Sequence, residues 1–212
     1  FEPIDRDLIE KWYGADAAQG GVVLKGVSRS SFDADCKITA FDASNWRHRG
    51  ENPENYRFYW FHSINQTRDH WQPLVDVTRI LDASVTPDAE FVQLFESVVD
   101  VEAFLRGFMP RVLMNDRDAL FLTSVHNGYV FWDPSDTEAR WSYLAFDMGA
   151  AWRSQVEDLL AIRDDGVRRF LTQPGPQRMY YGMIHQYTQG YCSVEVAGPF
   201  LDAPAPRPTG RG

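Results

Sequence analysis

Two short segments rich in aromatic and β-branched residues, at 129–132 and 141–146, constrain the fold of this chain most strongly. A polar, turn-forming stretch separates them, and this pattern predicts a β-hairpin. If Thr137 is near the centre of the turn, Asn127 lies opposite Asp147, because the two are equally distant from it in the sequence. Antiparallel pairing holds facing Cβ atoms roughly 4.5–5.5 Å apart. One metal ion could then contact both side chains, whereas a slip of one residue would turn one of them to the other face.

A further acidic side chain precedes this hairpin. Asp118 lies nine residues before Asn127, in a segment that can fold back beside the predicted pair. Phosphoryl-transfer enzymes of the kinase type need such a set, in which one Asp orients the attacking hydroxyl while an Asn and a second Asp hold magnesium. The sequence therefore predicts Asp118 as a catalytic residue, and Asn127 and Asp147 as metal ligands. Asp116, two residues away, is an alternative to Asp118.

Two more side chains each have a functional and a structural interpretation. Lys25 follows the apolar run 22–24, as does the lysine that binds ATP phosphates in kinases, but a strand-end lysine can equally extend its ammonium into solvent. His126 precedes Asn127, where it could contact a cofactor or hold the loop backbone through one ring nitrogen. Both are therefore candidate cofactor-binding residues, and base rates favour the structural interpretation of each.

Composition limits the class of protein. The chain has 212 residues, of which 44% are hydrophobic and 14% aromatic, enough for one sizeable core. Its formal net charge is −9, and an acidic surface repels phosphate backbones, so general nucleic-acid binding is disfavoured. No apolar run approaches the roughly 18 residues of a membrane helix. Cys36 and Cys192 could form a disulfide or remain separate thiols, and neither has a second ligand at the spacing of a zinc site.

Apolar periodicity and turn residues predict a mostly helical α+β domain. Besides the hairpin, the expected helices are 4–13, 71–81, 87–95, 100–113, 150–170 and 177–189, and the expected strands are 22–25 and 56–61. Asp100 should cap the fourth of these helices, and Pro110 should kink it or detach its N-terminal part. The segment 26–55 is polar and turn-rich. The Pro- and Gly-rich residues 201–212 are expected to be a loose tail or linker.

Several of these segments, in this order, resemble the spore-coat protein H (CotH) kinase-like family. The resemblance rests on segments 2–9, 21–25, 71–75, 99–105, 126–131 and 144–147. It extends over roughly residues 1–190, and the ordered arrangement is more specific than any single motif. The resemblance implies an atypical protein-kinase-like fold. This chain would hold mainly the helical C-terminal lobe, with the β-hairpin at the active site.

The resemblance also implies an activity and a cellular location. Members are secreted or spore-coat-associated protein kinases that use ATP and Mg²⁺ or Mn²⁺ to phosphorylate Ser or Thr of a protein partner. Carried over by position, Asp118 would be the catalytic-loop Asp, Asn127 the metal ligand of that loop, and Asp147 the Asp of the metal-binding motif.

The sequence departs from the family pattern in three places. The loop between Asp118 and Asn127 is longer than in many members. The N-terminal lobe and a Gly-rich phosphate loop have no counterpart, so residues 1–200 are expected to be a partial, C-terminal part of the kinase-like domain. The family commonly has a second Asp two positions after the first, where this chain has Gly149. The alternative to an active kinase is therefore a pseudokinase that serves as a surface binding or adhesion module.

Overall fold

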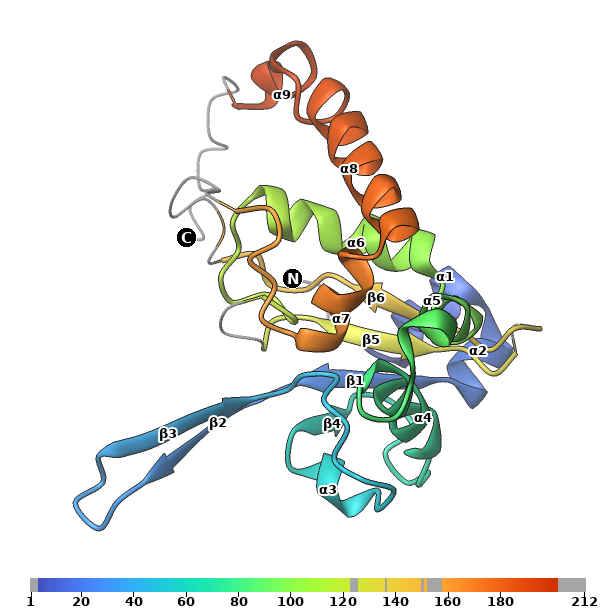
Figure 1. Cartoon of the computed structure of the whole chain (residues 1–212), viewed down its shortest axis with the longest axis vertical. Helices are drawn as coiled ribbons and strands as arrows, with labels where there is room; N and C mark the ends of the chain where they lie inside the picture. Colours follow the sequence, from blue (N-terminus) through green and yellow to red (C-terminus); the bar gives the residue numbers. More distant parts are fainter. Residues whose placement is uncertain (1–3, 123–125, 136, 150, 152–157, 202–212) are drawn as a thin grey trace, which may run out of the picture.

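A four-stranded antiparallel sheet forms the centre of the molecule. The computed structural model describes residues 4–122, 126–135, 137–149, 151 and 158–201. The strands lie in the order β4-β1-β5-β6. Their bounds are β1 (Val22–Gly26), β4 (Trp60–His62), β5 (Tyr129–Trp132) and β6 (Trp141–Leu144). Helices pack on both faces of this sheet (Figure 1), so the chain has the α+β composition that the sequence predicts.

The alternation of side chains along β1 divides the core into two parts. Val22 and Leu24 are buried in the larger cluster. The helices of that cluster are α4 (Gln72–Leu81), α5 (Asp88–Val98), α6 (Val101–Leu113), α7 (Asp165–Leu171) and α8 (Pro174–Gln189). Val23 is buried on the other face, against α1 (Arg6–Tyr13) and α2 (Ala15–Gly20). Because successive strand residues point to opposite faces, this continuous apolar run follows from the burial of β1 on both sides.

Helix α6 leads from the core to the candidate site. Its N-cap is Asp100, whose carboxylate accepts the Ala103 N–H at 3.0 Å, as the sequence predicts. The helix continues through Pro110 to its end, so Pro110 does not detach the N-terminal part. Proline has no N–H for the Arg106 carbonyl four residues earlier, and the Tyr187 hydroxyl donates to that carbonyl at 3.1 Å instead. Helix α8 thereby supplies the hydrogen bond that the proline removes.

The turn-rich segment 26–55 contains a β-ribbon that the sequence analysis missed. Its strands are β2 (Ser28–Phe32) and β3 (Ile38–Ala43), which pair only with each other. The ribbon projects away from the body of the molecule (Figure 1). At its outer end, the cross-strand neighbours Phe32 and Ile38 are both exposed. A ribbon that the core does not cover on either side needs no alternation of apolar and polar residues, so the usual strand signal is absent.

Two other predictions of local structure are wrong in part. The aromatic segment 56–61 begins inside a short helix, α3 (Glu54–Arg57), and only its last residues belong to β4. Of the expected helix 150–170, the structure contains only α7 at its end, preceded at 158–164 by turns and coil. The remainder, at 150 and 152–157, lies outside the described residues. Aromatic residues are enriched in strands, which led to the strand prediction, but here Tyr56 is buried from a short helix.

Helices α1, α4, α5, α6 and α8 agree with the predicted ranges to within a few residues at each end, whereas α2 was not predicted from the sequence. Helix α8 begins at Pro174 rather than after Pro176, since proline is favourable in the first helical turn. A last helix, α9 (Val194–Leu201), follows α8. The predicted tail 201–212 begins at Leu201, which is instead the last residue of α9. Residues 202–212 lie outside the described residues. Among the described helices, none is long and apolar enough to cross a membrane.

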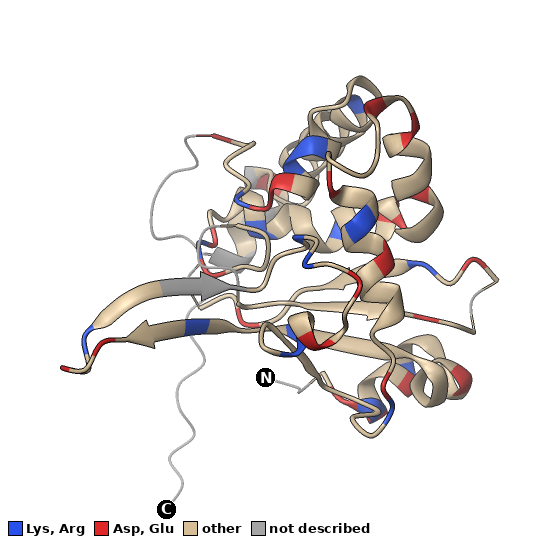
Figure 2. Ribbon diagram, turned by 60° about the horizontal axis from the view of Figure 1, so that its bottom comes forward, with Lys and Arg blue, Asp and Glu red and all other residues tan. Residues whose placement is uncertain are grey.

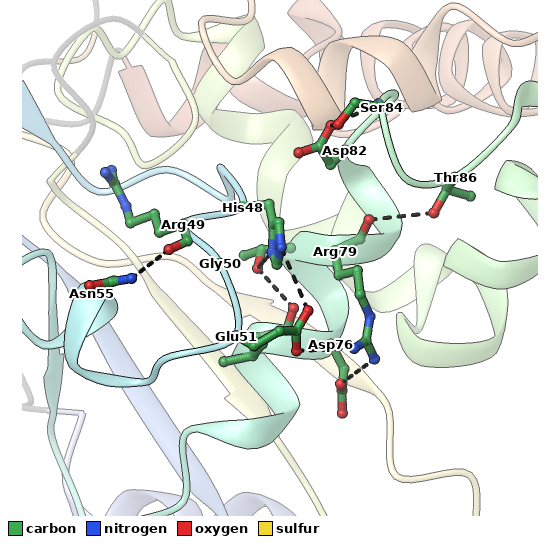
Figure 3. A network of polar contacts seen from close by, with 12 residues as sticks. His48, Arg49, Gly50, Glu51, Asn55, Asp76, Arg79, Asp82, Ser84 and Thr86 are labelled. Atoms are coloured by element: carbon green, nitrogen blue, oxygen red, sulfur yellow. Dashed lines mark hydrogen bonds and ion pairs between the residues drawn. The ribbon is translucent and has the colours of Figure 1, made fainter.

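The loop between β3 and α3 is fixed to α4 by a polar network (Figure 3). The Tyr56 hydroxyl, at its centre, lies 3.0 Å from Thr78 Oγ1 and 3.2 Å from His48 Nδ1. The other ring nitrogen of His48 lies 3.7 Å from Glu51, which also pairs with Arg79 on α4 at 3.1 Å. These contacts give a loop without regular structure a defined position against the core.

Charge and cysteines are distributed over the surface. Lys and Arg residues are interspersed with Asp and Glu over the helices and loops (Figure 2). Cys36, at the tip of the β2–β3 ribbon, and Cys192 are both exposed and free. Of the two alternatives from the sequence, the structure therefore has two separate thiols.

Candidate active site

The predicted hairpin is present, but its register differs by one residue from the prediction. Strands β5 and β6 are antiparallel, and Tyr129 faces Leu144 at the last pair of the ladder. Continued at this register, the ladder would place Asn127 opposite Phe146 rather than opposite Asp147. The ladder ends before that point, so Asn127 and Asp147 are not cross-strand partners, and the predicted pairing is wrong. A different contact brings their backbones together.

Main-chain hydrogen bonds join Asp118 to Asn127. The Asp118 carbonyl accepts the N–H groups of Asn127 at 2.8 Å and of His126 at 3.2 Å. The Leu120 N–H donates to the Asn127 carbonyl at 3.2 Å, and Ala119 forms an isolated parallel bridge with Asn127. The segment that carries Asp118 therefore runs directly beside the residues that lead into β5.

The side chain of Arg111, on α6, connects the two ends of the hairpin. Its Nη1 donates to the Phe146 carbonyl at 2.9 Å, and its Nη2 donates to the carbonyls of Asn127 at 3.0 Å and Asp147 at 3.1 Å. Because Nη2 contacts the carbonyls of both Asn127 and Asp147, the backbones of these two residues lie side by side. Arg111 has no exposed surface, so this contact is made entirely inside the protein.

Asp116 completes this buried cluster and differs from Asp118 in accessibility. Its Oδ2 lies 2.7 Å from Arg111 Nη2, and both side chains are fully buried. Burial raises the pKa of the Asp116 carboxyl, the Arg111 charge opposes this rise, and the charges of Asp118 and Asp147 add to it. The carboxylates of Asp118 and Asp147 therefore both lie close enough to Asp116 to influence its charge. Of Asp116 and Asp118, the half-buried Asp118 is the one that a substrate can reach.

Asp147 lies in a sharp turn that ends the hairpin. Its φ angle is +51°, in the left-handed region that non-glycine residues seldom occupy and that Asp tolerates better than most. Its Oδ1 accepts the Gly149 N–H at 3.1 Å, which stabilises the turn locally. Backbone strain of this kind concentrates at functional sites. The turn leaves the Asp147 side chain half-buried, with its backbone next to that of Asn127.

Lys25 and His126 both contact this cluster. The Lys25 ammonium lies 5.3 Å from the ring centroid of Phe146 and 5.7 Å from that of Tyr129, distances at which a cation is attracted to an aromatic ring. Lys25 therefore lies beside the residue that precedes Asp147. His126, which is half-buried, supplies its backbone N–H to the Asp118 carbonyl.

An apolar pocket of about 190 Å³ adjoins Asp147. Its lining residues are Ile4, Leu8, Trp12, Ala145, Phe146, Asp147 and Met148. Trp12, from α1, is 55% exposed at the edge of this pocket. A larger groove of about 660 Å³ between α6 and α8 has none of the candidate residues in its lining. Of these two hollows, only the pocket beside Asp147 is lined by a candidate site residue.

The oxygen atoms at this site suit a hard cation whose remaining ligands are water and substrate. Asn127 carries an amide oxygen and Asp147 a carboxylate. Within the part of the chain that the structure describes, no group of three His, Cys, Asp or Glu side chains could hold a metal ion. Magnesium usually takes one or two protein carboxylates and completes its shell with water and substrate phosphates. The donor set therefore fits magnesium bound together with a nucleotide, rather than a metal held by protein alone.

The contribution of Arg111 and the buried position of Asp116 are not among the predictions from the sequence. A signal for Arg111 exists: it follows Phe108 by three residues and Phe104 by seven, on the stripe that faces the core. A charged residue on an apolar helix face is almost never buried without a partner. The nearby carboxylates at 116 and 118 were the available partners, and distinguishing them requires the three-dimensional structure.

Comparison with known proteins identifies the family. No curated protein matches the chain. The family described as "CotH kinase protein" matches residues 4–187, which include every candidate site residue and most of the described structure. This match confirms the resemblance found in the sequence and indicates a kinase-like function. The chain therefore belongs to the CotH kinase protein family.

Proposed function

We propose that this chain carries the catalytic part of an atypical protein kinase, which transfers the γ-phosphate of ATP to Ser or Thr of a protein substrate. One observation carries the proposal: Asp118, Asn127 and Asp147 come from separate segments, and main-chain and Arg111 contacts bring their backbones together. Membership of the CotH kinase protein family supports it. Phosphoryl transfer needs little covalent chemistry from the protein, so positioning of such groups accounts for most of the catalysis.

Each of the three residues has a distinct role in this proposal. Asp118, the accessible acid of the Asp116–Asp118 segment, accepts a hydrogen bond from the substrate hydroxyl and orients it toward the phosphate. Asn127 and Asp147 would hold Mg²⁺ or Mn²⁺ through their side-chain oxygens. The metal ion, when bound, neutralises charge on the nucleotide phosphates. Asp116 cannot exchange roles with Asp118, since it is buried against Arg111.

The surroundings of Asp147 support nucleotide binding. The pocket beside it is lined by apolar side chains, with the partly exposed ring of Trp12 at its edge, and a planar base can be buried in such surroundings. The Lys25 ammonium lies over Phe146, where it is close enough to this region to attract phosphate charge. In the proposal, the base, the phosphates and the metal ligands therefore lie at one end of the sheet.

A thermal-shift experiment with Mg-ATP tests the proposed function. A ligand that binds only the folded state stabilises it by about 2.7 kcal/mol at 100 times its dissociation constant. The parent protein should show such a shift with Mg-ATP and lose it with ATP plus a chelator. Asp147→Asn should abolish the shift, because the amide removes the anionic metal ligand.

Asp133→Asn is the matched control for this experiment. Asp133, in the loop of the same hairpin, caps a turn through a carboxylate contact to a backbone N–H two residues later, as Asp147 does. Its replacement should leave the Mg-ATP shift unchanged. An Asp147→Asn variant that binds Mg-ATP as tightly as the parent would show that Asp147 is not a metal ligand.

The second candidate is a pseudokinase that binds a protein partner without catalysis. The exposed Gly149 favours it, because no carboxylate stands two positions after Asp147. A pseudokinase of this kind would show no phosphate transfer to Ser or Thr of casein or histone when Mn²⁺ and labelled ATP are supplied. Transfer that Asp118→Asn abolishes, while Mg-ATP binding is retained, would exclude it.

A further inference from the structure

The proposed chemistry leaves the ion pair between Arg111 and Asp116 without a role. Both side chains are fully buried, with 2.7 Å between Arg111 Nη2 and Asp116 Oδ2. Removing two charges from water is costly, and apolar residues of similar size are often as stabilising at such a position. A buried pair of this kind therefore calls for an explanation other than stability.

Arg111 forms hydrogen bonds beyond the end of the hairpin ladder. The last ladder pair joins Tyr129 to Leu144, and the three carbonyls that Arg111 contacts, at Asn127, Phe146 and Asp147, lie beyond it. The guanidinium is planar and presents five N–H donors in a fixed fork. Two of its nitrogens bind all three carbonyls at 2.9–3.1 Å. The distance between the two ends of the hairpin is thus set by one rigid group.

Asp116 connects this group to the third residue of the site. Its Oδ2 contacts Arg111, and its Oδ1 accepts the Asp118 N–H at 3.3 Å. The pair therefore contacts the backbone of Asp118 at one end and the backbones of Asn127 and Asp147 at the other. All three candidate residues are contacted by the same two side chains, and neither side chain is exposed to substrate.

We propose that the Arg111–Asp116 pair is a positioning device, which fixes the spacing of Asp118, Asn127 and Asp147 before any ligand binds. Its effect on the structure of the ligand-free protein does not depend on the proposed function. Its effect on the binding of metal and nucleotide rests on that function. Groups that orient metal ligands from behind typically change metal affinity by about 10–100-fold when they are replaced. The same range is expected here, although neither residue touches the metal.

The main test replaces both charges at once. The double variant Arg111→Met, Asp116→Leu removes the pair and fills the space with apolar side chains, an exchange that folded proteins often tolerate. Hydrogen exchange of the ligand-free protein should become at least about tenfold faster at 126–128 and 146–149, while helix α8, which the pair does not contact, keeps its protection. The dissociation constant for Mg-ATP, measured by calorimetry, should rise about 10–100-fold.

A matched control removes an ion pair from the same helix. Glu102 and Arg106 form an exposed pair on α6, so the double variant Arg106→Met, Glu102→Leu should leave both local exchange and Mg-ATP affinity unchanged. If the buried double variant does not fold, Arg111→Lys serves instead. Lysine keeps the charge opposite Asp116, but its three N–H donors radiate from one nitrogen and are too few for the carboxylate and all three carbonyls.

The outcomes separate this inference from the proposed function. Unchanged exchange and unchanged Mg-ATP affinity in the folded variants would overturn the positioning role. If the parent does not bind Mg-ATP, the proposed function fails, and the exchange of the ligand-free protein alone decides whether the pair positions the three residues. Faster exchange throughout the molecule, α8 included, would show that the pair contributes only to general stability and would also overturn the inference.

Discussion

The bond from Tyr187 to the Arg106 carbonyl predicts an energetic coupling between Tyr187 and Pro110. Tyr187→Phe removes one hydroxyl and keeps the ring, whose centroid lies 5.6 Å from that of Tyr191. The contact is 3.1 Å long and solvent-accessible, which places it in the lower part of the net range of about 0.5–1.5 kcal/mol for a protein hydrogen bond. We expect the variant to lose about 0.5–1 kcal/mol of unfolding free energy.

Pro110→Ala should suppress this cost. Alanine restores an N–H that can donate to the Arg106 carbonyl within α6, so the carbonyl keeps a partner when the Tyr187 hydroxyl is removed. In this background, Tyr187→Phe should cost only a few tenths of a kcal/mol. Pro110→Ala by itself should stabilise the helix, since proline in a helix interior is about 3 kcal/mol less favourable than alanine, although part of the gain is offset by greater freedom of the unfolded chain.

Urea unfolding of the parent, the two single variants and the double variant measures the coupling. The difference between the two costs of Tyr187→Phe is the interaction energy, expected to be about 0.5 kcal/mol or more. Tyr181→Phe is the control, because Tyr181 is an exposed tyrosine on the same helix; its cost should be the same in both backgrounds. If Tyr187→Phe lowers the unfolding free energy equally with proline and with alanine at position 110, Tyr187 does not replace the missing helical donor.

Four further substitutions test burial and packing. Burial lowers the pKa of His62 below 6.5, so the unfolded state binds more protons and the unfolding free energy falls as the pH decreases through about 6.5. His62→Phe should therefore reduce the loss of melting temperature between roughly pH 7.5 and pH 5, and an undiminished loss would contradict this. Asp164→Ala should cost about 2–4 kcal/mol in urea unfolding, because it removes the N-cap of α7 and leaves a second buried N–H unpaired; a cost below about 1 kcal/mol would mean that these bonds are replaced. Gly107→Ala should destabilise by about 1–3 kcal/mol, since the new Cβ would lie 2.6 Å from the Tyr143 carbonyl oxygen. Gly182→Ala, in open space on α8, should stabilise the protein by about 0.5–1 kcal/mol. If the melting temperatures of both glycine variants shift in the same direction, the close contact at Gly107 is not the cause.

The elements that the sequence predicts correctly have local signals. Helix α6 has an acidic N-cap at Asp100 and a continuous apolar stripe, and β1 has an uninterrupted apolar run between glycines. Each signal depends on residues within one or two turns of chain, so it can be read without the rest of the molecule. The β2–β3 ribbon has no such signal, because its strands do not divide into an apolar and a polar face.

The candidate site could be predicted as a set of residues but not as a geometry. Hairpin register depends on how the loop turns, and the length of a polar loop does not determine its centre to within one residue. The backbones of Asn127 and Asp147 are brought together by Arg111, which belongs to a helix earlier in the chain. Contacts between segments so far apart follow from tertiary packing, which a single sequence does not display.

The strand order has a consequence for how the molecule is made. Strand β1 can first pair with β4, as in the match of Leu24 with His62, but its other neighbour, β5, is far later in the chain, with Val22 facing Trp132. During synthesis, the edge of the apolar strand β1 that pairs with β5 therefore stays unpaired until the hairpin emerges from the ribosome. Shortened forms that stop before β5 should aggregate, and useful fragments of this protein have to extend beyond Leu144.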